Sequence, residues 1–121
     1  MSVHISGAIL AVADQDVMID FFVSKLGFEL TTDEEMWPGA RWVDLTPPGA
    51  QTRLVLNAAR DFGREPDVGY PMVFETADIV AEVERLRGLG LEVTDPKAEP
   101  WGTFVNVTDP EGRQLLIGRR T

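Results

Sequence analysis

The sequence contains no cysteine and a single histidine, His4, among its 121 residues. It therefore has no disulfide framework, no thiolate zinc site and no cysteine nucleophile. Basic residues are also scarce, since 11 Lys and Arg against 20 Asp and Glu give a net charge of −9. This balance argues against nucleic-acid binding, which needs clusters of Lys and Arg. The acidic residues between positions 14 and 35 either form a solvated face or attract a cationic ligand.

Long apolar runs are missing as well. The longest uncharged apolar stretch, Gly7 to Ala13, is far shorter than the ~20 residues of a membrane-spanning helix. The first residues lack the basic segment of a signal peptide and soon reach Asp14 and Asp16. We therefore expect a cytoplasmic protein. With 44% hydrophobic residues the chain can bury the core of one domain, which we place over 1–121.

The chain contains an internal duplication. Segment 26–30, Leu-Gly-Phe-Glu-Leu, returns as Leu-Gly-Leu-Glu-Val at 89–93, an offset of 89 − 26 = 63 positions. Asp14 and Asp78 stand at matching places before two helical patterns, and Thr46 and Thr108 before two turns. Offsets of 62 to 64 positions across these separate landmarks indicate two copies of one supersecondary unit.

Each copy predicts the element order βαβββ, and the fold class is therefore α+β. In the first copy we expect a helix from Asp14 to Leu26, ended by Gly27, and strands at 5–13, 28–33, 41–46 and 52–57. In the second copy we expect a helix over 78–89 and strands at 71–76, 91–94, 103–108 and 113–118. The modules then cover about 1–58 and 70–121, joined by the polar linker 59–69.

Strand alternation sorts the side chains onto two faces. One face is wholly apolar and is the predicted core beneath the helices: Leu10, Val12, Val43, Leu45, Leu54, Leu56, Met72, Phe74, Val105, Val107, Leu115 and Ile117. The other face mixes small, aromatic and charged residues, which suits an apolar-walled cup with a few polar groups inside. The alternative is an open sheet with an ordinary wetted side, partly covered by a dimer partner.

Several motifs carry a family resemblance. The duplicated βαβββ pattern, the segment from Asp16 to Phe28 and the segment from Trp101 to Gly112 resemble the vicinal oxygen chelate superfamily. That superfamily includes glyoxalase I, extradiol dioxygenases, fosfomycin-resistance enzymes and bleomycin-resistance proteins. The resemblance implies a curved mixed sheet around a cavity and a homodimer.

The resemblance also implies four metal-ligand positions, which in this sequence are Gly7, Arg53, Pro71 and Leu116. Glycine, proline and leucine offer no side-chain ligand, and arginine stays protonated with no acceptor. We therefore expect no metal and no cofactor. The inward carboxylates of Asp44 and Glu75 are the remaining candidates for a weak cation site or a general base. His4 has the opposite parity to Gly7 and is expected on the surface.

Two features of the mixed face favour ligand binding. Arg53 would pair with an anionic group, or else form an internal ion pair with Glu75 or Asp44. Trp42 and Phe104, 104 − 42 = 62 positions apart, would clamp a flat or cationic ligand; the alternative is that some of the three tryptophans fill a dimer interface or satellite core. With Trp37 and Trp101 in the rim loops, the predicted ligand-binding residues are Trp42, Arg53, Glu75, Trp101, Phe104, Asn106 and Leu116.

These observations favour a metal-free protein that binds a small organic molecule in an aromatic-lined cup, as antibiotic-binding relatives do. One alternative is a lyase or dioxygenase-type enzyme of the same superfamily, with an atypical divalent-metal site or a carboxylate base such as Glu75. A structural or regulatory dimer without a ligand is a third.

Overall fold

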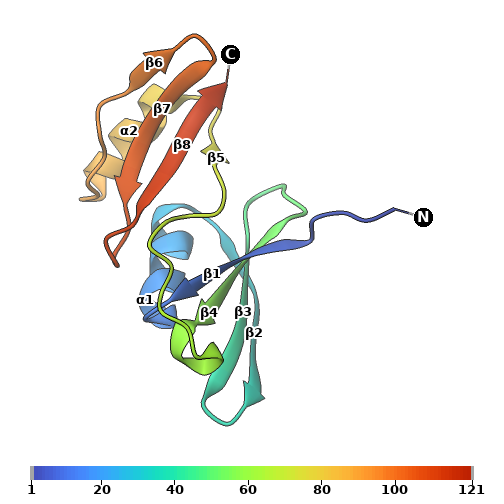
Figure 1. Cartoon of the computed structure of the whole chain (residues 1–121). Coiled ribbons are helices and arrows are strands. Elements are labelled where there is room, and N and C mark those ends of the chain that lie inside the picture. Colours follow the sequence, from blue (N-terminus) through green and yellow to red (C-terminus); the bar gives the residue numbers. More distant parts are fainter. Residues whose placement is uncertain (1, 121) are drawn as a thin grey trace. The chain divides into compact units, whose positions relative to one another are not determined.

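The computed structural model describes residues 2–120 and divides into two compact units. The first unit ends at Pro71 and the second begins at Met72. Each unit holds one four-stranded mixed sheet and one main helical segment, as the ribbon in Figure 1 shows. The predicted α+β class is confirmed.

The first unit contains β1 (Gly7–Val12), α1 (Gln15–Asp20), the π-helical turn η1 (Phe21–Lys25), β2 (Glu29–Trp37), β3 (Ala40–Thr46), β4 (Arg53–Ala58) and the 3₁₀ turn η2 (Ala59–Phe62). Its strands lie in the order β1-β4-β3-β2. β1 runs parallel to β4, and the other two pairs are antiparallel. β1 is therefore an edge strand.

The second unit contains β5 (Phe74–Glu75), α2 (Ile79–Gly88), β6 (Lys97–Glu99), β7 (Gly102–Thr108) and β8 (Gln114–Arg120). Its order, β5-β8-β7-β6, repeats that of the first unit. The first strand of the unit again pairs in parallel with the last, and the others pair antiparallel. Both predicted copies of βαβββ are therefore present.

Both helices begin at the predicted aspartates. Asp14 and Asp78 accept a hydrogen bond at 3.1 Å from the backbone N–H of Val17 and Ala81 respectively. Such caps satisfy N–H groups that the first helical turn leaves without a partner. The first helix continues as η1 to Lys25 and is capped by Leu26, and Gly27 follows with a φ of 74° that favours a residue without a Cβ.

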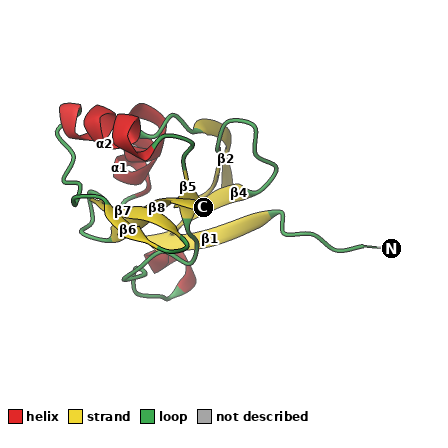
Figure 2. Ribbon diagram, turned by 90° about the horizontal axis from the view of Figure 1, so that it is seen from above, coloured by secondary structure: helices red, strands yellow, loops and turns green. Residues whose placement is uncertain are grey.

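The core of each unit lies between its sheet and its helix (Figure 2). α1 packs against β4, and α2 packs against β7 and β8. The sheet residues predicted for this face are buried, except that Met72 and Phe74 are half-buried. Each buried aliphatic side chain contributes roughly 1.5–3 kcal/mol.

The predicted strand at 91–94 is wrong in extent. Val93 forms only an isolated bridge to Val107, and the regular strand begins later, at Lys97. Pro96 stands between the two stretches and has no N–H to donate to the ladder, so pairing is interrupted there. The predicted strand at 71–76 is likewise reduced to the two residues of β5.

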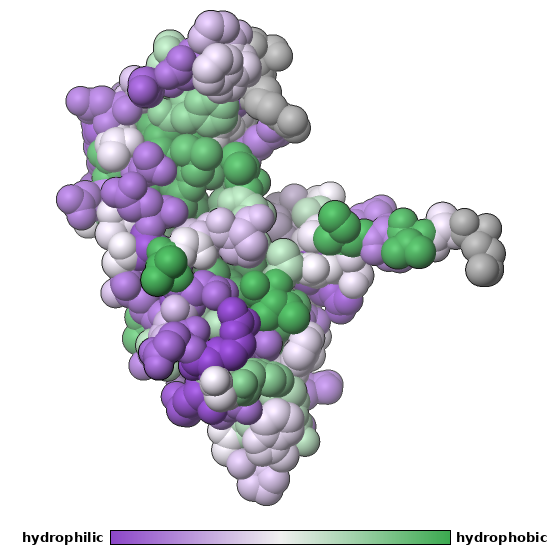
Figure 3. All heavy atoms as spheres, viewed as in Figure 1, coloured by the Kyte–Doolittle hydropathy of each residue, from purple (hydrophilic) through white to green (hydrophobic). Residues whose placement is uncertain are grey.

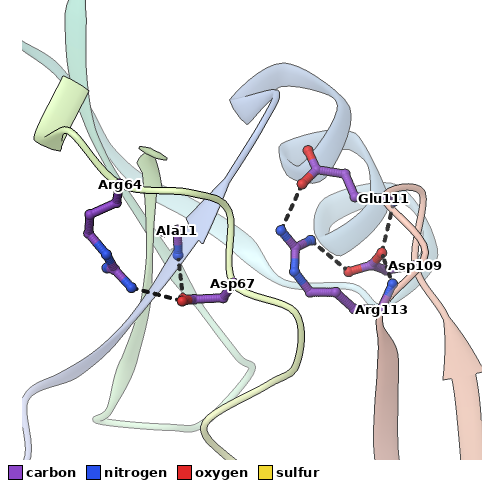
Figure 4. Close-up of polar contacts among 6 residues, drawn as sticks. All are labelled: Ala11, Arg64, Asp67, Asp109, Glu111 and Arg113. Carbon is purple, nitrogen blue, oxygen red and sulfur yellow. Dashed lines mark hydrogen bonds and ion pairs between the residues drawn. The ribbon is translucent and has the colours of Figure 1, made fainter. Parts of the chain in front are cut away.

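The segment predicted as a linker, 59–69, contacts the edge of β1. The Asp67 backbone N–H donates to the Ala11 carbonyl at 2.9 Å, and the Ala11 N–H donates to Asp67 Oδ2 at 2.9 Å. Arg64 holds the other oxygen of that carboxylate at 2.8 Å (Figure 4). Asp67 thus acts as a one-residue extension of the sheet and covers part of an exposed edge.

Candidate functional site

The open face of the second sheet, opposite α2, is hollowed by two cavities. Their volumes are about 480 Å³ and about 510 Å³, and Phe104 and Leu116 line both. Figure 3 shows apolar residues gathered over β7 and β8 in this unit. The first cavity is also lined by Thr94, Asp95, Lys97, Glu99, Trp101 and Asn106, and the second by Val73 and Glu75.

The sheet register places these side chains together. Asn106 pairs with Leu116 across β7 and β8, and Phe104 pairs with Gly118 two residues further along the ladder, on the same face. Glu75 pairs with Gly118 from the other side, in β5. Trp101, in the turn before β7, is 62% exposed at the mouth of the first cavity. Five of the seven predicted ligand-binding residues therefore line this face: Glu75, Trp101, Phe104, Asn106 and Leu116.

Sequence reasoning missed the polar wall of the first cavity. Asp95, Lys97 and Glu99 alternate just before Trp101, a spacing of two that would have revealed a strand with one charged face. Lys97 Nζ lies 3.5 Å from Glu99 Oε1, and Asp95 Oδ1 accepts a hydrogen bond from Arg87 at 2.9 Å. These pairs leave the wall polar.

The remaining two predicted residues, Trp42 and Arg53, lie in the first unit, where both donate hydrogen bonds to the buried carboxylate of Asp44. Asp44 is 4% exposed, and its Oδ1 accepts a hydrogen bond from Trp42 Nε1 at 2.9 Å. Its Oδ2 accepts one from Arg53 Nη1 at 3.2 Å. The sequence left Glu75 and Asp44 open as ion-pair partners of Arg53, and the structure shows the ion pair with Asp44. Because both carboxylate oxygens are engaged, Asp44 is poorly placed to remove a proton from a ligand.

Replacing Asp44 with alanine is expected to lower the free energy of unfolding by about 1–3 kcal/mol. The variant removes the acceptor for the Trp42 indole N–H and the ion-pair partner of Arg53. Urea unfolding measures the loss. Glu34→Ala, at an exposed position across the ladder from Trp42, is the matched control. Equal losses in the two variants would contradict the structural role assigned to Asp44.

Asn57, on the same face of β4, is 6% exposed, and its Oδ1 has no hydrogen-bond partner among residues 2–120. A buried acceptor without a hydrogen bond costs free energy unless a water or ligand donor reaches it.

Trp37, predicted at the rim, packs its ring against Phe62 with centroids 5.9 Å apart. Its contact in this unit is therefore with η2.

The four positions at which the resemblance implies metal ligands carry no donor cluster. Gly7 and Arg53 are register partners across β1 and β4, and Leu116 lines the cavities of the second unit. Within the described range 2–120, no three His, Cys, Asp or Glu side chains converge as a metal site requires. His4 is exposed in the segment before β1.

The outer hairpin of the first sheet carries a shifted carboxyl group. Arg41 binds Asp33 through two hydrogen bonds, at 2.9 and 2.7 Å, and reaches Asp16 at 2.9 Å. The hydrogen bonds from Arg41 lower the pKa of Asp33 below its ordinary value, while partial burial opposes the shift. The same contacts with Asp33 and Asp16 raise the pKa of Arg41.

Acid is therefore expected to remove the stabilisation that Asp33 provides. Because its folded-state pKa is lowered, the contribution is full above the unfolded value of about 3.9 and is lost as pH falls through the folded pKa. For this partly exposed pair the contribution is below about 1 kcal/mol. Thermal melts between pH 7 and pH 2 measure this loss: the melting temperatures of Asp33→Asn and the wild type should differ at neutral pH and converge in acid. Glu84→Gln, exposed on α2, is the control, and a constant difference at all pH values would contradict the assignment.

Comparison with known proteins identifies the class. The family model for the Glyoxalase/Bleomycin resistance protein/Dioxygenase superfamily matches residues 3–117, and the chain belongs to that superfamily. The uncharacterized protein YetH of Bacillus subtilis is 34% identical over 107 residues, which cover 88% of this chain and 89% of YetH. No helix in the described part of the chain is long and apolar enough to cross a membrane.

Two solved structures of similar sequence share the fold. A superfamily member from Sphaerobacter thermophilus has a TM-score of 0.87 and 31% identity, with 97% of each chain covered. TnmS3, an antibiotic binding protein from Streptomyces sp. CB03234, has a TM-score of 0.86 and 30% identity, covering 99% of this chain and 98% of its own.

Proposed function

We propose that this protein binds a planar small organic molecule, without a metal, on the open face of the β5-β8-β7-β6 sheet. The observation that carries the proposal is the pair of cavities of about 480 and 510 Å³ that share Phe104 and Leu116. These volumes lie within the ~300–1,000 Å³ range of small-molecule sites, which are mostly apolar with a few placed polar groups. The antibiotic-binding relative TnmS3 supports a binding function over a purely structural one.

The ligand chemistry follows from the lining. The ring of Phe104 and the exposed indole of Trp101 offer flat apolar surfaces on which an aromatic ring system stacks. Among the described lining residues, Asp95, Glu99 and Glu75 are acidic and Lys97 is basic. Together with the net charge of −9, this lining favours a basic ligand over an acidic one.

The metal-free state is part of the proposal. It is supported by the side chains of Gly7, Arg53, Pro71 and Leu116, none of which donates an electron pair to a divalent cation. The competing function is an enzyme of the same superfamily that uses Glu75, in the second cavity, as a base. Elemental analysis of protein purified without chelators tests the metal-free state, because stoichiometric Fe, Ni, Zn or Mn would overturn it.

Calorimetric titration tests ligand binding itself. Proflavine serves as a flat tricyclic cation and naphthalene-2-sulfonate as a flat anion. We expect the wild type to bind proflavine more tightly, and Trp101→Ala to weaken that binding because the variant removes one stacking surface. Trp37→Ala, whose contact is with Phe62, is the matched control. No binding of either probe would defeat the proposal.

A cytoplasmic homodimer remains a proposal, supported by family membership. Sedimentation velocity would give twice the chain mass of 13.4 kDa for a dimer. A single species at the monomer mass would contradict it.

A further inference from the structure

Phe104 occupies space that only a glycine leaves open. Phe104 and Gly118 are direct partners across β7 and β8. A Cβ added to Gly118 would lie 2.4 Å from Phe104 Cδ1 and 2.5 Å from Cε1, far inside contact distance. By contrast, a Cβ at Gly88, at the end of α2, would meet nothing within 4 Å. The edge of the Phe104 ring therefore lies where a side chain at position 118 would start.

Backbone conformation does not explain why residue 118 is a glycine. Positive φ angles occur at six glycines of the described chain, and Gly118 is not one of them. Glycine within a strand costs roughly 0.5–1 kcal/mol relative to alanine and often marks a close approach of another group. At Gly118 that group is the Phe104 ring, so the glycine provides space and not conformational freedom.

The orientation of the Phe104 ring shapes both cavities. Strand side chains ordinarily stand roughly perpendicular to the sheet. Over Gly118 the Phe104 ring instead leans across β8, and both cavities border it. A side chain at position 118 would force the ring to rotate away from β8 into the space that a ligand needs.

We propose that Gly118 is the residue that determines specificity at this site: by seating Phe104 against β8, it admits flat ring systems. The inference rests on the proposed function, since it assigns the shape preference of the same cavities. Gly118 acts through Phe104 and is a positioning residue.

The test compares Gly118→Ala with the control Gly88→Ala. Proflavine is the flat cation, and cyclohexyltrimethylammonium is a cation of the same charge without a planar ring system. We expect Gly118→Ala to weaken proflavine binding by about tenfold or more, through loss of the stacked geometry. Binding of the non-planar cation should change little, and Gly88→Ala should bind both probes like the wild type. The Phe104 ring resonances should shift in Gly118→Ala without any ligand.

The outcomes separate this inference from the proposed function. If the wild type binds neither probe, the proposed function fails and the inference falls with it. If the wild type binds proflavine but Gly118→Ala binds it equally well, the inference alone is overturned. If Gly118→Ala does not fold, Gly118→Ala/Phe104→Leu should restore folding but not tight proflavine binding. An unfolded double variant would show that the clash is not with Phe104.

Discussion

Arg113→Ala is expected to lower the free energy of unfolding by about 3–5 kcal/mol, the typical cost of removing one partner of a buried ion pair. Arg113 Nη1 lies 3.1 Å from Asp109 Oδ2, and Nη2 lies 2.8 Å from Glu111 Oε1 (Figure 4). The side chains of Arg113 and Asp109 are only 3% and 0% exposed. Alanine would leave two carboxylates without their cation, one of them fully buried.

The same aspartate holds the turn between β7 and β8. Asp109 Oδ1 accepts hydrogen bonds from the backbone N–H groups of Glu111, at 2.8 Å, and Arg113, at 3.0 Å. Burial by itself lowers the pKa of Arg113, but hydrogen bonds with Glu111 and Asp109 outweigh it and raise the pKa overall. The guanidinium therefore stays charged throughout the pH range in which the protein is folded.

Urea unfolding of Arg113→Ala measures the loss, with Arg85→Ala as the control. Arg85 pairs with Glu82 on the surface of α2, and its side chain is 45% exposed. Removing an exposed pair of this kind costs less than about 1 kcal/mol. A loss in Arg113→Ala as small as that in Arg85→Ala would show that the turn does not depend on the buried cluster.

Phe104→Ala is expected to weaken proflavine binding by about tenfold to a hundredfold, because the ligand would complete the burial of this half-buried ring, and burying a Phe side chain is worth roughly 1.5–3 kcal/mol. Phe104 is chosen because it borders both cavities. Phe62→Ala is the matched control, since Phe62 lies in η2 of the first unit and packs against Trp37. Calorimetry should show wild-type affinity for Phe62→Ala. Equal affinity in both variants would place the ligand elsewhere.

Most of the fold could be predicted because its signals are local. Asp14 and Asp78 mark helix starts through hydrogen bonds that span three residues, and strand alternation gives the core directly. The error near Val93 came from treating an apolar segment as a full strand although Pro96 interrupts the ladder. The attachment of 59–69 to β1 depends on Asp67 meeting Ala11, a long-range contact that no local pattern encodes.

The candidate site was only partly accessible to sequence reasoning. Parity placed Phe104, Asn106 and Leu116 on one face, and the structure shows all three lining the first cavity, while their role in binding stays a prediction. Parity also placed Asp44 inward as a candidate base, since alternation cannot reveal that Trp42 and Arg53 occupy its oxygens. The fit of the Phe104 ring over Gly118 depends on side-chain orientation and emerges only in three dimensions.

Binding of a planar ligand on the open face of the second sheet can be observed residue by residue in a ¹H–¹⁵N correlation spectrum of the wild type, titrated with proflavine. We expect saturable shifts concentrated at Phe104, Asn106, Leu116 and Gly118. Saturable shifts confined to Trp42, Asp44 and Arg53, or no shifts at all, would contradict binding on this face.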